Sequence, residues 1–105
     1  MQQSMQTVDW SALTLQPNTR CRIGTPTLPP TNALITRVTH QRGAIWIFGK
    51  PYERGATERP LAQIDTGQSE GQIQKTAADG IVLKWFHPKQ GRGTLLTFPR
   101  RNGQT

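Results

Sequence analysis

The stretch NALITRVTHQRGAIWIFGK, residues 32–50, has the pattern of two antiparallel strands joined by a tight turn. Apolar and polar side chains alternate before the turn, and β-branched residues, which favour strands, stand on both sides of it. Gly43 suits the left-handed position that ends a type I turn with a bulge, and Gln41 and Arg42 then form the turn's centre. The stretch therefore predicts a β-hairpin.

The second strand of this hairpin, AIWIF at residues 44–48, is apolar on both faces. This pattern is typical of a buried central strand, or of a strand whose second face meets something else. With the turn placed as above, Val38 faces Trp46 and Thr36 faces Phe48 across the pair. We expect Trp46 to belong to the core.

The rest of the chain repeats this pattern of short strands and turns. Residues 9–16 suit either one short helical turn, the most helix that we expect, or an extended segment. Two segments interrupt the pattern. Residues 25–32, TPTLPPTN, are too rich in proline for a helix or a central strand, and residues 87–93, HPKQGRG, are predicted to be a flexible loop. The other predicted elements are strands at 19–24, 61–65 and 94–98 and a hairpin at 72–86 that turns at Asp79-Gly80.

These elements predict an all-β fold, a small antiparallel barrel or sandwich of SH3-like or OB-like size with six to seven short strands. The 105 residues suit a single basic β domain, with disordered ends at residues 1–6 and 100–105. From the alternation we expect a core made of Ile35 or Leu34, Val38, Ile45, Ile47, Ile64, Ile73, Leu83, and Leu95 or Leu96.

The chain contains one cysteine, so no disulfide can form within it. Its first ten residues lack the basic segment and apolar run of a signal peptide, and no stretch reaches the ~18 apolar residues of a spanning helix. We therefore expect a reducing, cytoplasmic location and no membrane partner.

Basic residues are unevenly distributed along the chain, whose net charge is +7. Residues 1–52 and 80–105 are both strongly basic, and the second of these segments has no acidic residue. Residues 53–79 hold most of the acidic residues and are net negative. This distribution favours a polyanionic partner.

The sequence offers little for catalysis or for metal binding. Cys21 lies between Arg20 and Arg22, and in a strand it points inward while both arginines point outward. One cysteine and two histidines at no recognised ligand spacing predict no metal site, and no glycine-rich phosphate loop precedes a helix. We expect no cofactor and no catalytic residue.

Basic and aromatic residues are interleaved near the C-terminus, in LKWFHPKQGRG at residues 83–93. In an alternating strand, one of Trp85 and Phe86 points away from the core unless both faces are covered. Single-stranded nucleic acid binds such surfaces, because bases stack on rings while Lys and Arg hold phosphates. The predicted nucleic-acid-binding residues are Arg42, Lys84, Trp85, Phe86, His87, Lys89, Arg92, Arg100 and Arg101.

The main functional hypothesis is therefore a non-catalytic module that binds DNA or RNA, with single strands favoured over duplex. An alternative is an inhibitor or adaptor from a mobile element, whose edge strands beside the proline-rich segment would add to a partner's sheet. A third hypothesis is a metal-independent ribonuclease. It would use His40 or His87 with Glu53 or Glu58 and a phosphate-binding Arg54 or Arg92.

Overall fold

Seven antiparallel strands form one sheet in the computed structural model, which describes residues 10–76 and 80–99. The order across the sheet is β4-β3-β2-β1-β7-β6-β5, so β4 and β5 are its edges and the sheet is not closed into a barrel. The all-β prediction is confirmed. The elements are η1 (Trp10–Ala12), β1 (Thr19–Thr25), β2 (Leu28–Gln41), β3 (Ala44–Pro51), β4 (Arg59–Asp65), β5 (Glu70–Lys75), β6 (Ile81–His87) and β7 (Gly91–Phe98).

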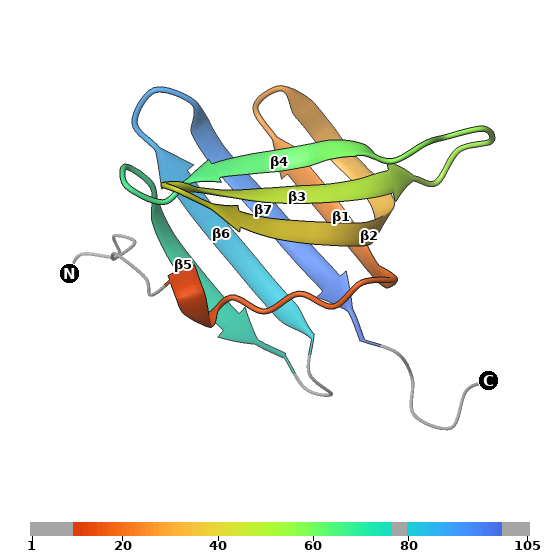
Figure 1. The fold of residues 1–105 in the computed structure, drawn as a ribbon, viewed down its shortest axis with the longest axis horizontal. Coiled ribbons are helices and arrows are strands. Elements are labelled where there is room, and N and C mark those ends of the chain that lie inside the picture. Colours follow the sequence, from red (N-terminus) through yellow and green to blue (C-terminus); the bar gives the residue numbers. More distant parts are fainter. Residues whose placement is uncertain (1–9, 77–79, 100–105) are drawn as a thin grey trace.

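The sheet folds over on itself at β2, which is its longest strand (Figure 1). Residues 28–35 pair with β1, whereas the pairing with β3 runs from Ala33 to Gln41. A bulge between Ile35 and Arg37 lies where the two ladders overlap, and bulges bend strands. As a result β4, β3 and the end of β2 form one layer, which crosses the layer of β1, β7, β6 and β5 at a steep angle (Figure 1).

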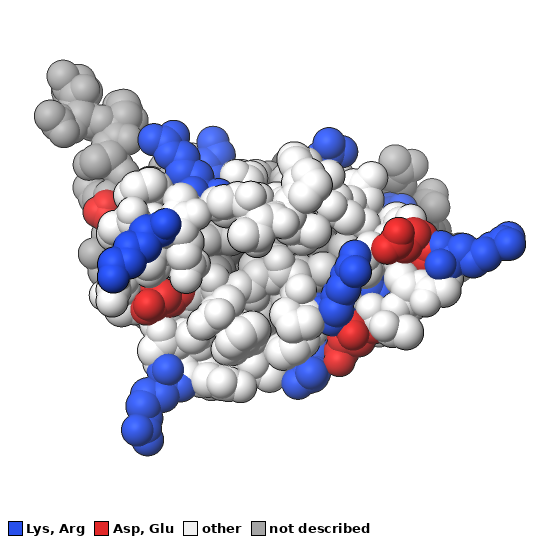
Figure 2. Space-filling model, turned by 90° about the horizontal axis from the view of Figure 1, so that it is seen from above, with Lys and Arg blue, Asp and Glu red and all other residues white. Residues whose placement is uncertain are grey.

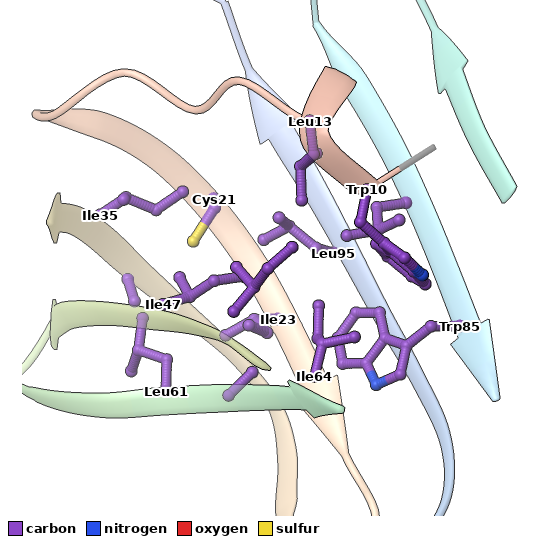
Figure 3. Packing of buried hydrophobic residues seen from close by; sticks show 14 residues of the cluster. Trp10, Leu13, Cys21, Ile23, Ile35, Ile47, Leu61, Ile64, Trp85 and Leu95 are labelled. Atoms are coloured by element: carbon purple, nitrogen blue, oxygen red, sulfur yellow. The ribbon is translucent and has the colours of Figure 1, made fainter. Parts of the chain in front are cut away.

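The hydrophobic core fills the space between the two layers (Figure 3). The predicted members Ile45, Ile47, Ile64, Leu83 and, of the paired alternatives, Ile35 and Leu95 are buried. Val38 and Ile73 are only partly buried and pack against this cluster. The core also contains residues that were not predicted from the alternation: Trp10, Leu13, Ile23, Ala33, Leu61, Ala62 and Trp85.

A row of glycines makes room for the two buried tryptophans. Gly71, Trp85 and Gly93 are opposite one another on β5, β6 and β7. The ring of Trp85 lies on Gly93, and the ring of Trp10 lies on Gly71. Because a side chain at either glycine would occupy the position of a ring, these two glycines are required by packing.

The hairpin at residues 32–50 forms, but its predicted register is wrong by one residue near the turn. Gln41 pairs with Ala44, so the loop has only two residues, Arg42 and Gly43. Gly43 does have the predicted left-handed backbone, with a φ of 74°.

The shorter loop places Val38 opposite Ile47, Thr39 opposite Trp46 and Arg37 opposite Phe48. Ile45 and Ile47 then point into the core. Trp46 points to the other face of β3, where it is half-buried, so the prediction that it belongs to the core is wrong.

The proline-rich segment is also more regular than predicted. Pro29 and Pro30 lie within β2, close to its first residue. They are tolerated because β3 does not pair with β2 before Ala33, so this part of β2 has β1 as its only neighbour in the ladder. The flanking strands are not sheet edges, because β1 is the middle strand of the seven.

Candidate nucleic-acid interface

Alternation along β6 separates the predicted binding residues into two groups. Trp85 and His87 point into the molecule and are only 4% and 5% exposed. Lys84 and Phe86 point outward, and Phe86 is 36% exposed. Trp85 and His87 are therefore not part of the surface, and Phe86 is the exposed aromatic residue of the pair.

The outward side chains of β1, β7 and β6, three strands that lie side by side in Figure 1, form one continuous surface. Arg20 on β1 is opposite Phe98 on β7, and Arg92 on β7 is opposite Phe86 on β6. Phe98 is 40% exposed. We call this surface the basic face; its residues are Arg20, Arg22, Lys84, Phe86, Arg92 and Phe98.

None of the four cations on the basic face forms an ion pair within the described part of the chain. Glu70, on the neighbouring strand β5 opposite Phe86, is the one acidic residue beside them in the described ladders. Four unneutralised cations within three neighbouring strands give this surface a positive potential.

The acidic residues of the other layer are instead used locally. Glu53 pairs with Arg59, at 3.5 Å between carboxylate and guanidinium, and Glu58 pairs with Arg37 at 3.2 Å. The pKa of Glu58 is lowered, first because it accepts a hydrogen bond from the Thr36 hydroxyl at 2.5 Å and then because of Arg37. The cations of this layer are therefore partly neutralised.

Each layer has an arginine close to an aromatic ring, and the two pairs differ in how tightly they pack. Arg37 lies over the Phe48 ring at 4.0 Å, and Phe48 stacks with Trp46 at 6.2 Å between ring centres. On the basic face the Arg92 guanidinium is 5.9 Å from the centre of the Phe86 ring. The first group is packed and balanced by Glu58, whereas the second is more open.

His87 has a structural role at the end of β6. Its Nδ1 accepts hydrogen bonds from the backbone N–H groups of Lys89 and Gln90, at 3.0 and 3.1 Å. Because Nδ1 acts as an acceptor, the ring proton is on Nε2, which is 3.6 Å from the Asp65 carboxylate. His87 thus fixes the turn after β6 and links it to the end of β4.

The segment that follows His87 is shorter and more ordered than the predicted flexible loop. Only residues 88–90 form the turn, and β7 begins at Gly91, which has a φ of 99°. Gly93 lies in β7 beneath Trp85, where it serves packing. Lys89 is exposed in the turn, beside the Phe86 end of the basic face.

Two other groups of predicted residues do not join this surface. Arg42 is at the tip of the β2–β3 hairpin, in the other layer. Arg100 and Arg101 lie outside the described residues, as do Asp79 and both predicted disordered ends. In the described ion pairs Glu53 meets Arg59 and Glu58 meets Arg37, and the ribonuclease hypothesis stays a prediction.

The possible metal ligands and the one thiol can be placed in the structure. Residues 10–76 and 80–99 contain no group of three His, Cys, Asp or Glu side chains that could hold a metal ion. Cys21 points inward between outward arginines, as predicted, and burial raises the pKa of its thiol to about 11. This thiol is therefore protonated at neutral pH.

A groove of about 410 Å³ lies between β4 of one layer and the β1–β2 and β6–β7 turns of the other. Its lining includes Trp46, Trp85, Pro26 and Pro60, and no charged residue contributes to it. Figure 2, seen from above, shows a broad uncharged stretch across this side of the molecule with cations and acids around it. The groove shares no residue with the basic face, so it offers no charge to a phosphate.

The predicted binding residues did not include Arg20, Arg22 and Phe98, which belong to the basic face. The alternation around Cys21 already indicated that both arginines point outward. Nothing in the sequence showed that β1 pairs with β7, which is the pairing that places Arg20 beside Phe98.

No helix among the described residues is long and apolar enough to cross a membrane. Comparison of the chain with protein families, with curated proteins and with solved structures finds no match.

Proposed function

We propose that this protein is a non-catalytic module whose basic face binds the phosphate groups of nucleic acid. The observation that carries the proposal is that Arg20, Arg22, Lys84 and Arg92 share one surface on which none of them forms an ion pair within the described residues. In the other layer, Arg37 and Arg59 are paired with glutamates. Free cations on a rigid sheet gain affinity by releasing counterions from a phosphate backbone. Lys89, in the adjacent turn, extends the same positive surface.

The proposal includes a cytoplasmic location. It gives His87 and Trp85 a supporting role, because both lie beneath the surface and hold β6 and its turn in place. Phosphate contacts determine affinity and position, and they carry no sequence information. We therefore expect binding with little preference for base sequence.

The test is a salt titration of oligonucleotide binding with two double variants of equal charge. Arg22→Gln with Lys84→Gln removes two cations from the centre of the basic face, and Lys50→Gln with Arg54→Gln removes two from the other layer. The first pair should lower the slope of log affinity against log salt by about 1.4–1.8, at about 0.7–0.9 for each lost phosphate contact. The control pair should leave the slope nearly unchanged.

Two results would count against the proposal. Equal changes in slope for the two double variants would mean that net charge, and no particular surface, attracts the oligonucleotide. Absence of binding by the wild type at low salt would exclude nucleic acid as the ligand of this face.

A second candidate function is an adaptor that binds a protein partner through an edge strand. It is favoured by β4, an edge strand whose central residues 61–64 are uncharged and which borders the uncharged groove. Exposed edges of this kind accept an extended peptide as an added strand. This candidate predicts that replacing Gln63 with Pro abolishes partner binding and leaves oligonucleotide binding unchanged.

A further inference from the structure

We infer that the ligand of the basic face is a single strand of DNA or RNA that runs along β7, with one base stacked on Phe86 and another on Phe98. This inference rests on the proposed function and adds to it the form of the nucleic acid, its path and the residues that contact bases. It follows from the positions of the two exposed rings relative to the cations.

The two rings are at opposite ends of the basic face. Phe86 is opposite Arg92 near the start of β7, and Phe98 is the last residue of β7. Six residue steps separate Arg92 from Phe98, which corresponds to about 20 Å along a strand. Both rings are more than a third exposed and sit on strands, so their positions are fixed by the sheet.

The cations lie between and beside these rings in register. Lys84 is opposite Thr94 and Arg22 is opposite Leu96, so both are between the two ends, and Arg20 is beside Phe98. Leu96 and its neighbour Val82 are half-buried and provide an apolar floor at the centre. Rings and an apolar floor that are flanked by cations match a chain whose bases lie on the sheet and whose phosphates lie beside the flanking cations.

A duplex fits this surface less well for two reasons. Its bases are stacked on one another, so Phe86 and Phe98 would find no free base. The basic face is also part of a wider sheet, because β5 and β2 flank its three strands. These five strands are about 19 Å wide, at about 4.8 Å between neighbours, and so do not enter a major groove that is about 12 Å wide. The face can therefore touch only the outer phosphates of a duplex.

The experiment is fluorescence anisotropy with labelled oligo(dT) and oligo(U) of two to twelve nucleotides and with a blunt DNA duplex. The proteins are the wild type, Phe86→Ala, Phe98→Ala and the control Tyr52→Ala. Tyr52 is a suitable control because it is the most exposed large hydrophobic residue in the described chain and follows β3 in the other layer. Leucine variants of both phenylalanines retain apolar volume but lack a stacking ring.

Each Phe→Ala variant should weaken single-strand binding by about 5- to 150-fold with an unchanged salt slope. The leucine variants should be similarly weak, because they have no aromatic ring, and Tyr52→Ala should stay within about twofold of the wild type. Affinity should rise steeply until the oligonucleotide reaches about four nucleotides and so spans both rings. The oligo(dT) and oligo(U) arms show whether one sugar is preferred.

The outcomes separate this inference from the proposed function. Salt-dependent binding that is as tight for the duplex as for single strands, or that does not respond to either phenylalanine variant, overturns the inference and leaves the proposed function standing. Leucine variants that bind single strands as tightly as the wild type also overturn the inference, because the rings would then supply only apolar area. If no oligonucleotide binds in a salt-dependent way, the proposed function itself fails.

Discussion

Replacement of Gly93 by alanine should destabilise the protein through the core while leaving the surface unchanged. A Cβ atom at this position would overlap the six-membered ring of Trp85, and its distance to Cη2 would be 2.7 Å. Ordinary contacts begin at about 3.4 Å, so even Cη2 must move by about 0.7 Å, and the ring atoms nearer to the Cβ must move further. Trp85 is 4% exposed and has little room to retreat.

The expected loss in the free energy of unfolding is about 1–3 kcal/mol, which is typical of an overpacked core. The gain from replacing a glycine within a strand, about 0.5–1 kcal/mol, offsets only part of a severe overlap. Urea denaturation followed by tryptophan fluorescence measures the change. Gly67→Ala is the matched control, because the nearest atom to its Cβ would be an oxygen of the Asp65 carboxylate at 3.6 Å, an ordinary contact distance. This substitution should change stability by less than about 0.5 kcal/mol.

A second substitution shows whether the overlap with the ring is the cause. In the Gly93→Ala background, Trp85→Phe should recover part of the lost stability, because the smaller ring leaves space for the new methyl group. In the wild-type background the same change should be destabilising, because it leaves a cavity. Equal stability of Gly93→Ala and wild type would refute the proposed packing of Trp85 on β7.

Two further predictions concern the core. Cys21 should react slowly with a thiol reagent in the native state and rapidly in urea. The pKa of the Cys21 thiol is about 11 in the folded protein and 9.0 in the unfolded chain. Its contribution to the free energy of unfolding is therefore fully present below pH 9 and is lost as the pH rises to about 11. Rapid labelling of the native protein at pH 8 would contradict the burial of this thiol. Ile47→Ala should cost about 2–5 kcal/mol in chemical denaturation, since Ile47 is fully buried, and a loss below about 0.5 kcal/mol would mean that its place in β3 is wrong.

The parts of the fold that could be predicted depend on local backbone chemistry. Alternation is a property of any strand, so it predicted correctly that Cys21 points inward between two outward arginines. Gly43 has the left-handed backbone that its position in a turn required. The register could not be predicted, because a two-residue and a three-residue loop around Gly43 are both acceptable and the bulge after Ile35 is set by the bend between layers.

The candidate site was only partly predictable for a similar reason. Alternation required Trp85 and Phe86 to point in opposite directions, but which of them faces the core depends on Gly71 and Gly93, which leave space for large rings on the inner face. Arg20 and Arg22 joined the site only through the pairing of β1 with β7, a contact between distant parts of the chain.

The pairing of β1 with β7 means that the sheet can be completed only late in the synthesis of the chain. β1 forms early in the chain, but one of its two neighbours, β7, is the last strand, and Arg20 pairs with Phe98 across almost the whole length of the described chain. Until residues 91–98 leave the ribosome, both β1 and β6 have an unpaired edge that another chain could occupy. Such distant pairings slow folding, because a long loop must close before they form. A chain that stops before β7 should therefore aggregate, and the interface should appear only when the last strand is in place.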